Sequence, residues 1–482
     1  MINRFLTKGI GYLLIISYII INGVMIYFDH YYLLLLPFLL GLIYLFIYRL
    51  DLVFLLIVFC TPLSFNFENL AIGGIGFYFP TEPLLLTFSV VFLLKYLLNH
   101  KSSKDLIHYK NHITIIILLQ LIWIIICSIT SELPIVSMKF FISRAWFIIP
   151  MFFYAIHFFK EGKHRISQFL WAYLLPVFIV TTYTLLNHMS HGFSEEAGHW
   201  VMWPFFKDHT SYGAIIALSI PIALWLYKSS QNPINKFLIQ LIIIVLLVGL
   251  YFSYTRAAWL SVIGAVIVYF LFYFKIKLKW LITIGVIPIF FIALNYSEIS
   301  YLLQKNDAEH TTENFSERVE SMSNVSSDAS NLERLNRWNC AFQLFKERPI
   351  TGWGPGTYSF VYAPFQDASD ITIISTNFGD GGNAHSEYLG PLAEQGLIGM
   401  ILMITLVCLI FIYMSNYQIK CDDSFQKKLV LMIILALTTY FTHGILNNYL
   451  DTDKASVPVW GLIALFVSLK SYSSKQSKSQ LT

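Results

Sequence analysis

The sequence predicts an all-α polytopic membrane protein with about 12–14 transmembrane helices and one large external loop between helices 11 and 12. Of its 482 residues, 56% are hydrophobic and only 12% are charged, a composition far more apolar than that of a soluble domain. The apolar residues form runs of about 17 to 20, long enough for a helix to cross a hydrocarbon core of about 30 Å. One long stretch of mixed polarity, residues 296–395, interrupts these runs.

The apolar runs predict the individual transmembrane helices. They lie at residues 9–27, 32–48, 52–66, 82–99, 113–130, 140–158, 168–187, 211–227, 236–253, 257–274, 280–295, 396–415, 428–446 and 457–470. The third run is the weakest, because Pro62 and Ser64 interrupt it. The first run follows only Arg4 and Lys8 and has no small-residue cleavage site, which predicts a retained anchor and not a removed signal peptide.

The positions of Lys and Arg predict the orientation, because short cytoplasmic loops carry an excess of both. With the N-terminus inside, most of the 32 Lys and Arg residues fall in inner segments. Outside the large loop, the remaining outward positions hold Lys139, Arg144, Lys207, Arg256 and Lys454. We therefore expect a multi-pass membrane protein with both termini cytoplasmic and the large loop external.

These features divide the chain into three parts. Residues 1–295 form a bundle of about eleven transmembrane helices, 296–395 form the large periplasmic loop, and 396–482 hold about three more helices and a cytoplasmic tail. The chain has five cysteines, of which only Cys340 falls clearly outside, so no disulfide framework is expected. The net charge of +4 follows from the positive-inside loops, and we expect no nucleic-acid partner and no cofactor.

Two outward-facing cations precede the sixth predicted helix or lie within it. Lys139 is expected at its outer end, and Arg144 lies five residues further in, about 7 Å deeper. An arginine inside a membrane is costly unless it is paired or faces a water-filled cavity, which makes Arg144 a candidate functional residue. Snorkelling to the interface is the alternative.

A further outer segment, residues 187–210, is rich in histidine. His188, His191, His199 and His209 lie in it, but their spacing matches no metal-ligand pattern, and a solvated cavity wall is the favoured interpretation. Lys207 leads directly into the next helix, where it can face the same outer cavity as Arg144.

Arg256 stands in a very short outer connection, Ser253 to Leu260. An arginine there departs from the charge bias of the rest of the chain. Its guanidinium fork suits a substrate phosphate, and an anionic lipid headgroup is the alternative ligand.

The large loop holds three features. Leu332, Leu335, Phe342 and Phe345 share one face of a predicted amphipathic helix suited to the membrane surface, with Arg337 among its polar residues. A glycine-proline turn follows at Gly352 to Gly356. His385 and Glu387 then precede the next membrane helix, where a histidine near neutral pH can act as a general base.

An acidic pair, Asp451 and Asp453, lies in the last outer connection. Such a pair can hold a divalent cation. Helix capping or an ion pair with Lys454 is the favoured alternative, and we predict no metal site.

Several short segments together resemble one family. They are Tyr254 to Trp259, Arg337-Trp338, Arg348 to Gly356, His385 to Leu389 and Leu392 to Gly399. They resemble the O-antigen ligase and O-antigen polymerase family of bacterial membrane glycosyltransferases, whose plan of many spans with one large outer loop agrees with this chain. Family members commonly follow the histidine with asparagine, whereas Ser386 follows here.

The resemblance implies transfer of a glycan from an undecaprenyl-pyrophosphate carrier, in lipopolysaccharide or polysaccharide biosynthesis. The acceptor would be lipid A core, another glycan or a protein hydroxyl. By motif position His385 takes the role of base and Arg256 that of pyrophosphate ligand, which Arg144 matches less closely. The candidate substrate-binding residues are Arg256, Arg144, Lys207, Lys139, Glu387 and Arg337.

The chemistry suits these residue types. Fixed arginines stabilise the negative charge that develops on a departing pyrophosphate, so no metal is required. A histidine can take the proton of the attacking hydroxyl. Two other classes stay open: a transporter of lipid-linked oligosaccharide, which would favour broken or charged helices at mid-membrane, and a non-catalytic component of a polysaccharide-export complex.

Overall fold

The computed structural model describes residues 2–67, 78–98, 111–275, 329–367, 375 and 382–479. Nine of the described helices are long and apolar enough to cross a membrane, and the all-α polytopic prediction is confirmed. The strands in these ranges are two residues long: β1 (Phe65–Asn66) pairs antiparallel with β2 (Tyr78–Phe79). The predicted helix at 280–295 and the polar segment 296–328 lie outside the described residues.

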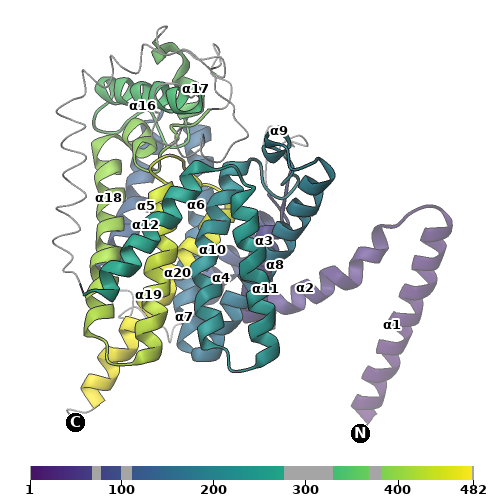
Figure 1. Ribbon diagram of the computed structural model, residues 1–482. Helices are drawn as coiled ribbons and strands as arrows, with labels where there is room; N and C mark the ends of the chain where they lie inside the picture. Colours follow the sequence, from purple (N-terminus) through teal and green to yellow (C-terminus); the bar gives the residue numbers. More distant parts are fainter. Residues whose placement is uncertain are drawn as a thin grey trace. The chain divides into compact units, whose positions relative to one another are not determined.

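The chain forms two compact units, Met1–Leu56 and Ile57–Thr482. The first contains α1 (Ile2–Tyr27), the 3-10 turn η1 (Tyr32–Leu35) and α2 (Leu36–Tyr48), and α3 (Leu50–Leu63) crosses the boundary (Figure 1). Its apolar stretches, Ile15–Tyr27 and Tyr32–Tyr48, are shorter than the nine spans. Most described side chains of α1 and α2 are apolar and exposed, which suits contact with lipid.

The second unit is a helical bundle. Its further membrane-length helices are α4 (Thr81–Leu98), α5 (His112–Ile129), α6 (Pro134–Ile148) continued through η5 (Ile149–Tyr154) and α7 (Ala155–Lys160), α8 (Lys163–Ser190), α10 (His209–Ser229), α11 (Pro233–Tyr251), α12 (Arg256–Tyr273), α18 (Leu389–Lys420) and α19 (Ser424–His443). A short α9 (Glu195–Gly198) precedes α10, and α20 (Asp453–Ser479) closes the chain.

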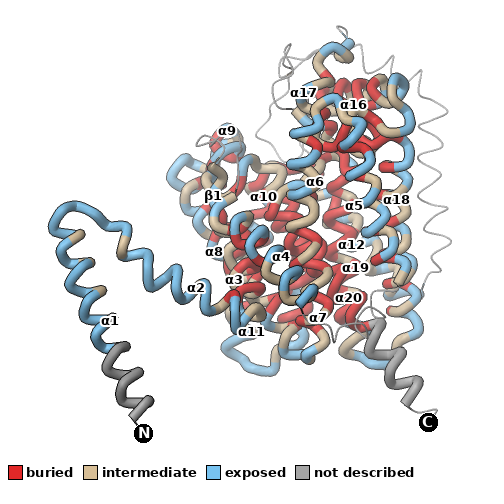
Figure 2. The backbone as a smooth tube through the Cα atoms, turned by 180° about the vertical axis from the view of Figure 1, so that it is seen from behind, coloured by how far each residue is buried: buried red, intermediate tan, exposed pale blue. Residues whose placement is uncertain are grey.

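Two helices form the centre of this bundle. α10 packs against α8, α11, α12 and α19, and 78% of its apolar window is buried. α20 is buried from Asp453 to Leu469 and packs against α6, η5, α7 and α19 (Figure 2). Burying apolar side chains on all sides of a helix requires neighbours on all sides.

The described part of the large loop packs on α18 and departs from the predicted amphipathic pattern. α16 (Ala329–Glu347) buries Glu333, Arg337 and Cys340 on one face, whereas Phe342 is 46% exposed. The prediction that Arg337 lies on the polar face is wrong. Its ion pair with Glu333 allows this polar pair to be buried, and the face packs against α17 (Tyr358–Val361), η6 (Ala363–Phe365) and α18.

The glycine-proline turn pairs with a kink in α18. Backbone N–H groups of Trp353 and Gly354 donate to the carbonyls of Ala393 and Glu394 at 3.1 and 2.8 Å. At Gly396 the helix is interrupted by a positive φ of 68°, and a Cβ there would lie 2.1 Å from the Ile350 carbonyl oxygen. The kink directs the residues before it, including His385, onto the end of the bundle where α10, α12 and α20 begin and α19 ends. We call this the loop-bearing end.

Candidate functional site

His385 lies in a segment wedged between α16 and the end of α19. Its own N–H donates to Asn383 Oδ1 at 3.0 Å, and Trp338 Nε1 donates to its carbonyl oxygen at 3.5 Å. Two residues on, the N–H of Glu387 donates to the carbonyl oxygen of Gly444 at 2.8 Å. His385 has a positive φ of 46°, which is uncommon for a residue with a side chain. Backbone contacts on both sides therefore fix the position of the imidazole.

The surroundings of His385 keep the imidazole neutral. Burial, followed by the charges of Arg334 and Arg337, lowers the pKa of His385 to about 4, whereas a hydrogen bond with Asn447 opposes the shift. At neutral pH the imidazole therefore carries no charge and has a nitrogen able to accept a proton. That is the protonation state that a general base requires.

Arg334 connects three histidines from different parts of the chain. It interacts electrostatically with His209 at the start of α10, with His385 before α18 and with His443 at the end of α19. The guanidinium belongs to the second turn of α16. A permanent positive charge thus stands beside the neutral imidazole, as a reaction that develops negative charge requires.

Outer loops meet around the start of α10. Asp208 caps this helix by accepting from the Ser211 N–H at 2.7 Å, and the Thr210 hydroxyl donates to Asp208 at 2.6 Å and contacts the Tyr449 hydroxyl. His199 and His209 approach to 3.2 Å between their Nδ1 atoms. This polar rim at the loop-bearing end joins segments 199–210 and 447–450.

Arg256 and Lys207 adjoin the same rim. Arg256 is the first residue of α12, and the preceding Thr255 donates its hydroxyl to the carbonyl oxygen of His209 at 2.8 Å. Lys207 is exposed and lies two residues before His209. The structure therefore gathers Arg256, Lys207 and Arg334 around the start of α10.

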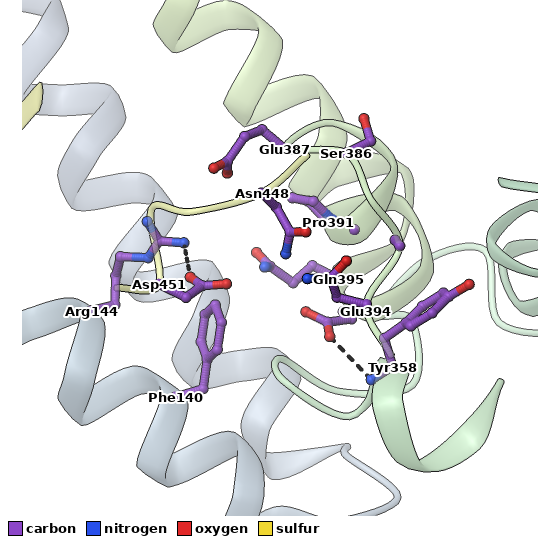
Figure 3. Close-up of a pocket in the computed structure, with 13 residues that line it drawn as sticks. Phe140, Arg144, Tyr358, Ser386, Glu387, Pro391, Glu394, Gln395, Asn448 and Asp451 are labelled. Atoms are coloured by element: carbon purple, nitrogen blue, oxygen red, sulfur yellow. Dashed lines mark hydrogen bonds and ion pairs between the residues drawn. The ribbon is translucent and has the colours of Figure 1, made fainter. Parts of the chain in front are cut away.

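A small pocket next to His385 contains Arg144. Figure 3 shows Arg144 and Phe140 of α6 facing the start of α18 and the 448–451 segment. Arg144 Nη2 forms an ion pair with Asp451 at 2.7 Å, and its Nη1 donates to the Leu450 carbonyl oxygen at 3.2 Å. The guanidinium predicted to be costly in the membrane is thus paired.

Glu387 anchors the histidine segment to the connection between α19 and α20. One oxygen of its buried carboxylate accepts from the Tyr440 hydroxyl at 2.5 Å and from the N–H groups of Tyr449 and Leu450 at 2.7 and 2.9 Å. Burial raises the pKa of Glu387, and these donors oppose the shift. These hydrogen bonds hold the segment that carries His385 against the 449–450 backbone.

Residues 241–404 match the family model described as O-antigen ligase. This segment is an O-antigen ligase domain. The family recognised from the short motifs is thereby confirmed, and the domain supports a function of the O-antigen ligase or polymerase type. No curated protein matches the chain.

The O-antigen ligase domain includes part of the predicted site. The matched residues contain Arg256, Arg337, His385 and Glu387, whereas Lys139, Arg144 and Lys207 precede them. Arg337 is buried against Glu333 at 2.5 Å and against the ring of Tyr362, 4.1 Å from its centroid. It acts on His385 through its charge.

Lys139 lies apart from the pocket that contains Arg144. Five residues along a helix turn the two side chains to different faces of α6. Lys139 is exposed and interacts electrostatically with Glu82 of α4, and it does not line the pocket.

The acidic pair of the last outer connection does not converge on one point. Asp451 pairs with Arg144, whereas Asp453 accepts from the Ser64 hydroxyl at 2.6 Å. Lys454 Nζ donates to the carbonyl oxygens of Thr61 and Ser64 at 2.6 and 2.9 Å. Among the described residues, no group of three or more His, Cys, Asp or Glu side chains could hold a metal ion.

The sequence interpretation missed Arg334 as a site residue. Of the polar residues on the predicted amphipathic helix, only Arg337 was named as a candidate. The available signal was the position of Arg334 four residues before Trp338, a residue of the family resemblance, because residues four apart share a helix face.

Proposed function

We propose that the protein is a membrane glycosyltransferase that moves a glycan from an undecaprenyl-pyrophosphate carrier to an acceptor hydroxyl. The observation that carries the proposal is the neutral imidazole of His385 beside the fixed positive charge of Arg334, within the O-antigen ligase domain. Lipid A core, another glycan and a protein hydroxyl are the candidate acceptors.

The residues account for each bond change. The acceptor oxygen attacks the anomeric carbon as its proton passes to a ring nitrogen of His385. The bond from that carbon to the carrier's phosphate oxygen breaks, and the leaving pyrophosphate takes the electron pair. Arg334 and Arg256 stabilise its charge, with Lys207 at the entrance. A single displacement inverts the anomeric centre, and the arginines supply the charge that a metal ion would otherwise supply.

The same proposal sets the orientation. The Lys and Arg distribution favours cytoplasmic termini and an external loop-bearing end in the bacterial inner membrane. The described parts of the large loop, residues 329–367 and 382–395, then cover the site, and the described helices of the second unit provide its base.

The decisive experiment compares His385→Ala with His191→Ala in a strain lacking the gene. His191 is an exposed histidine at the end of α8 and serves as the matched control. We expect His385→Ala to abolish glycan transfer while expression and membrane insertion persist, and His191→Ala to restore it. Gel analysis of surface glycans provides the measurement. Normal glycan in the His385→Ala strain would favour a transporter or an export component.

The same gels separate the two reactions of the family. Unpolymerised single repeats in the deletion strain indicate a polymerase, and carrier-linked polymer missing from its acceptor indicates a ligase. Transfer assays on the purified protein with a chelator present test the metal-independent mechanism, and a divalent-ion requirement would contradict it.

A further inference from the structure

The pocket that contains Arg144 differs in chemistry from the rim around Arg334. It lies between α6, the start of α18 and segment 448–451, and its lining includes Ser386 and Glu387 but not His385. The two residues that follow the proposed base thus form one wall. A molecule in the pocket would be next to the base without occupying the arginine rim.

The pocket contains a buried polar atom without a protein partner. Asn448 Oδ1 is buried and has no hydrogen bond in the described structure. Figure 3 shows the Asn448 side chain directed toward Gln395 and Glu394. Because nearly all buried polar atoms are hydrogen-bonded to protein or water, this oxygen is available to accept from a water or from a ligand that displaces it.

The charges of the pocket disfavour an anion. Among the described lining residues the one cation, Arg144, is paired with Asp451, and two more carboxyl groups, those of Glu387 and Glu394, line the wall. Glu394 accepts from the Tyr358 N–H at 3.1 Å. A pyrophosphate here would meet these carboxyl groups and a guanidinium that is already paired. It belongs with Arg256, Lys207 and Arg334 at the rim.

The remaining groups suit hydroxyls. Amides of Asn448 and Gln395 both donate and accept, and a carboxylate such as Asp451 accepts. A sugar hydroxyl also donates and accepts hydrogen bonds, so sugar hydroxyls can pair with both the donors and the acceptors of the pocket, whereas a purely anionic or cationic ligand cannot. The rings of Phe140 and Tyr358 add apolar lining for the face of a pyranose.

We infer that this pocket binds a sugar ring of the acceptor, placing its hydroxyl beside His385. The inference rests on the proposed glycosyl transfer. The donor's reacting sugar is bonded directly to pyrophosphate and must stay with the arginines, which leaves this pocket to the acceptor.

Direct binding tests the inference without requiring transfer. The probes are glucose, galactose, N-acetylglucosamine and their methyl glycosides, measured by saturation-transfer NMR on the purified full chain, with inorganic pyrophosphate as the contrasting probe. We expect at least one sugar to bind the wild type, and Asn448→Leu to weaken it at least tenfold. Pyrophosphate binding should be unchanged in Asn448→Leu and weakened in Arg334→Gln.

Two further variants test whether a loss of sugar binding comes from the pocket or from misfolding. Gln395→Met removes a second amide of the pocket and should also weaken sugar binding, whereas Gln120→Leu, on α5 against Met403, should not. Each variant is compared with the wild type by size-exclusion elution and unfolding temperature. If no sugar of the panel binds, or if pyrophosphate displaces the sugar, the inference is overturned.

The outcomes also separate this inference from the proposed function. A wild type that binds a sugar through Asn448 but transfers no glycan would remove the proposed function and leave the sugar site. A wild type that transfers glycan while Asn448→Leu leaves both sugar binding and the acceptor KM unchanged would remove the sugar site alone.

Discussion

His385 shows how neighbouring residues determine what a side chain can do. Alone, a histidine before a membrane helix has an ordinary pKa and is half protonated near pH 6.5. In the folded protein, burial and the charges of Arg334 and Arg337 lower the pKa of His385 to about 4. The residue type was evident from the sequence, but its protonation state depends on α16.

The lowered pKa predicts the acidic limb of the pH–rate profile. Between pH 6.5 and about 4 an ordinary histidine would be protonated, whereas His385 stays neutral and competent as a base. We therefore expect transfer to persist below pH 6 and to fall only as the pH approaches about 4. The activity that remains in Arg334→Gln should fall at a higher pH than that of the wild type, because a charge that lowers the pKa of His385 has been removed. A wild-type limb at pH 6.5 would contradict the assignment.

Arg334 is expected to require its guanidinium and not only its charge. Lysine keeps the positive charge but loses the planar fork that can contact two phosphate oxygens. Arg334→Lys should lower kcat at least about tenfold, equivalent to about 1.4 kcal/mol in the barrier. Arg165→Lys, at an exposed ion pair with Glu161, is the matched control and should retain full activity. Equal kcat values in Arg334→Lys and Arg165→Lys would show that the guanidinium of Arg334 is not required for transfer.

Among the elements, the kink of α18 sets the geometry of the site. The residues before Gly396 pair with the glycine-proline turn, and Trp123 Nε1 donates to the Gln395 carbonyl oxygen at 2.9 Å. Carbonyls released by a broken helix thus regain partners from α5 and the turn. The sequence indicated a turn and a helix here, but not that they would pair with each other.

Gly396→Ala tests the kink. A Cβ would lie 2.1 Å from the Ile350 carbonyl oxygen at a φ of 68°, so either the turn or the helix must move. We expect a loss of about 1–3 kcal/mol or more in stability, seen as a lower unfolding temperature and reduced transfer. Gly264→Ala is the control, since its nearest contact, Thr442, is 3.6 Å away. Similar unfolding temperatures for both variants would show that the kink is dispensable.

At the scale of the whole molecule, the charge bias and the proposed chemistry require the same orientation. The arginines and His385 lie at the loop-bearing end, and a carrier-linked glycan is used on the outer face in the proposed reaction. Lys207 lies at this end and Lys236, in the first turn of α11, at the opposite one.

Single cysteines test that orientation. In a cysteine-free variant of the chain, Lys207→Cys should react with a membrane-impermeant maleimide in intact spheroplasts. Lys236→Cys should react only after permeabilisation. The ratio of labelling before and after permeabilisation is the measurement. The opposite pattern would invert the topology and place the site on the cytoplasmic side.

The sequence by itself determined the helices and the family, and it predicted His385 as the base. Apolar runs specify membrane helices because an unpaired backbone is so costly in hydrocarbon, and every predicted span within the described ranges contains a helix, although the third ends in strand β1. The short motifs around Trp338, Gly354 and His385 were sufficient to recognise the family, because the residues of each motif are neighbours in the chain.

Tertiary structure alone decided which charged residues act together. Arg144 was predicted to hold substrate, but an aspartate more than three hundred residues away pairs with it, and Glu387 is held by Tyr440 and the 449–450 backbone. Arg334 comes within electrostatic range of His385 because α16 packs on α18. The periodicity of the sequence predicts which face of a helix is apolar. It does not predict which distant residues pair with the charged groups of the other face and so allow that face to be buried.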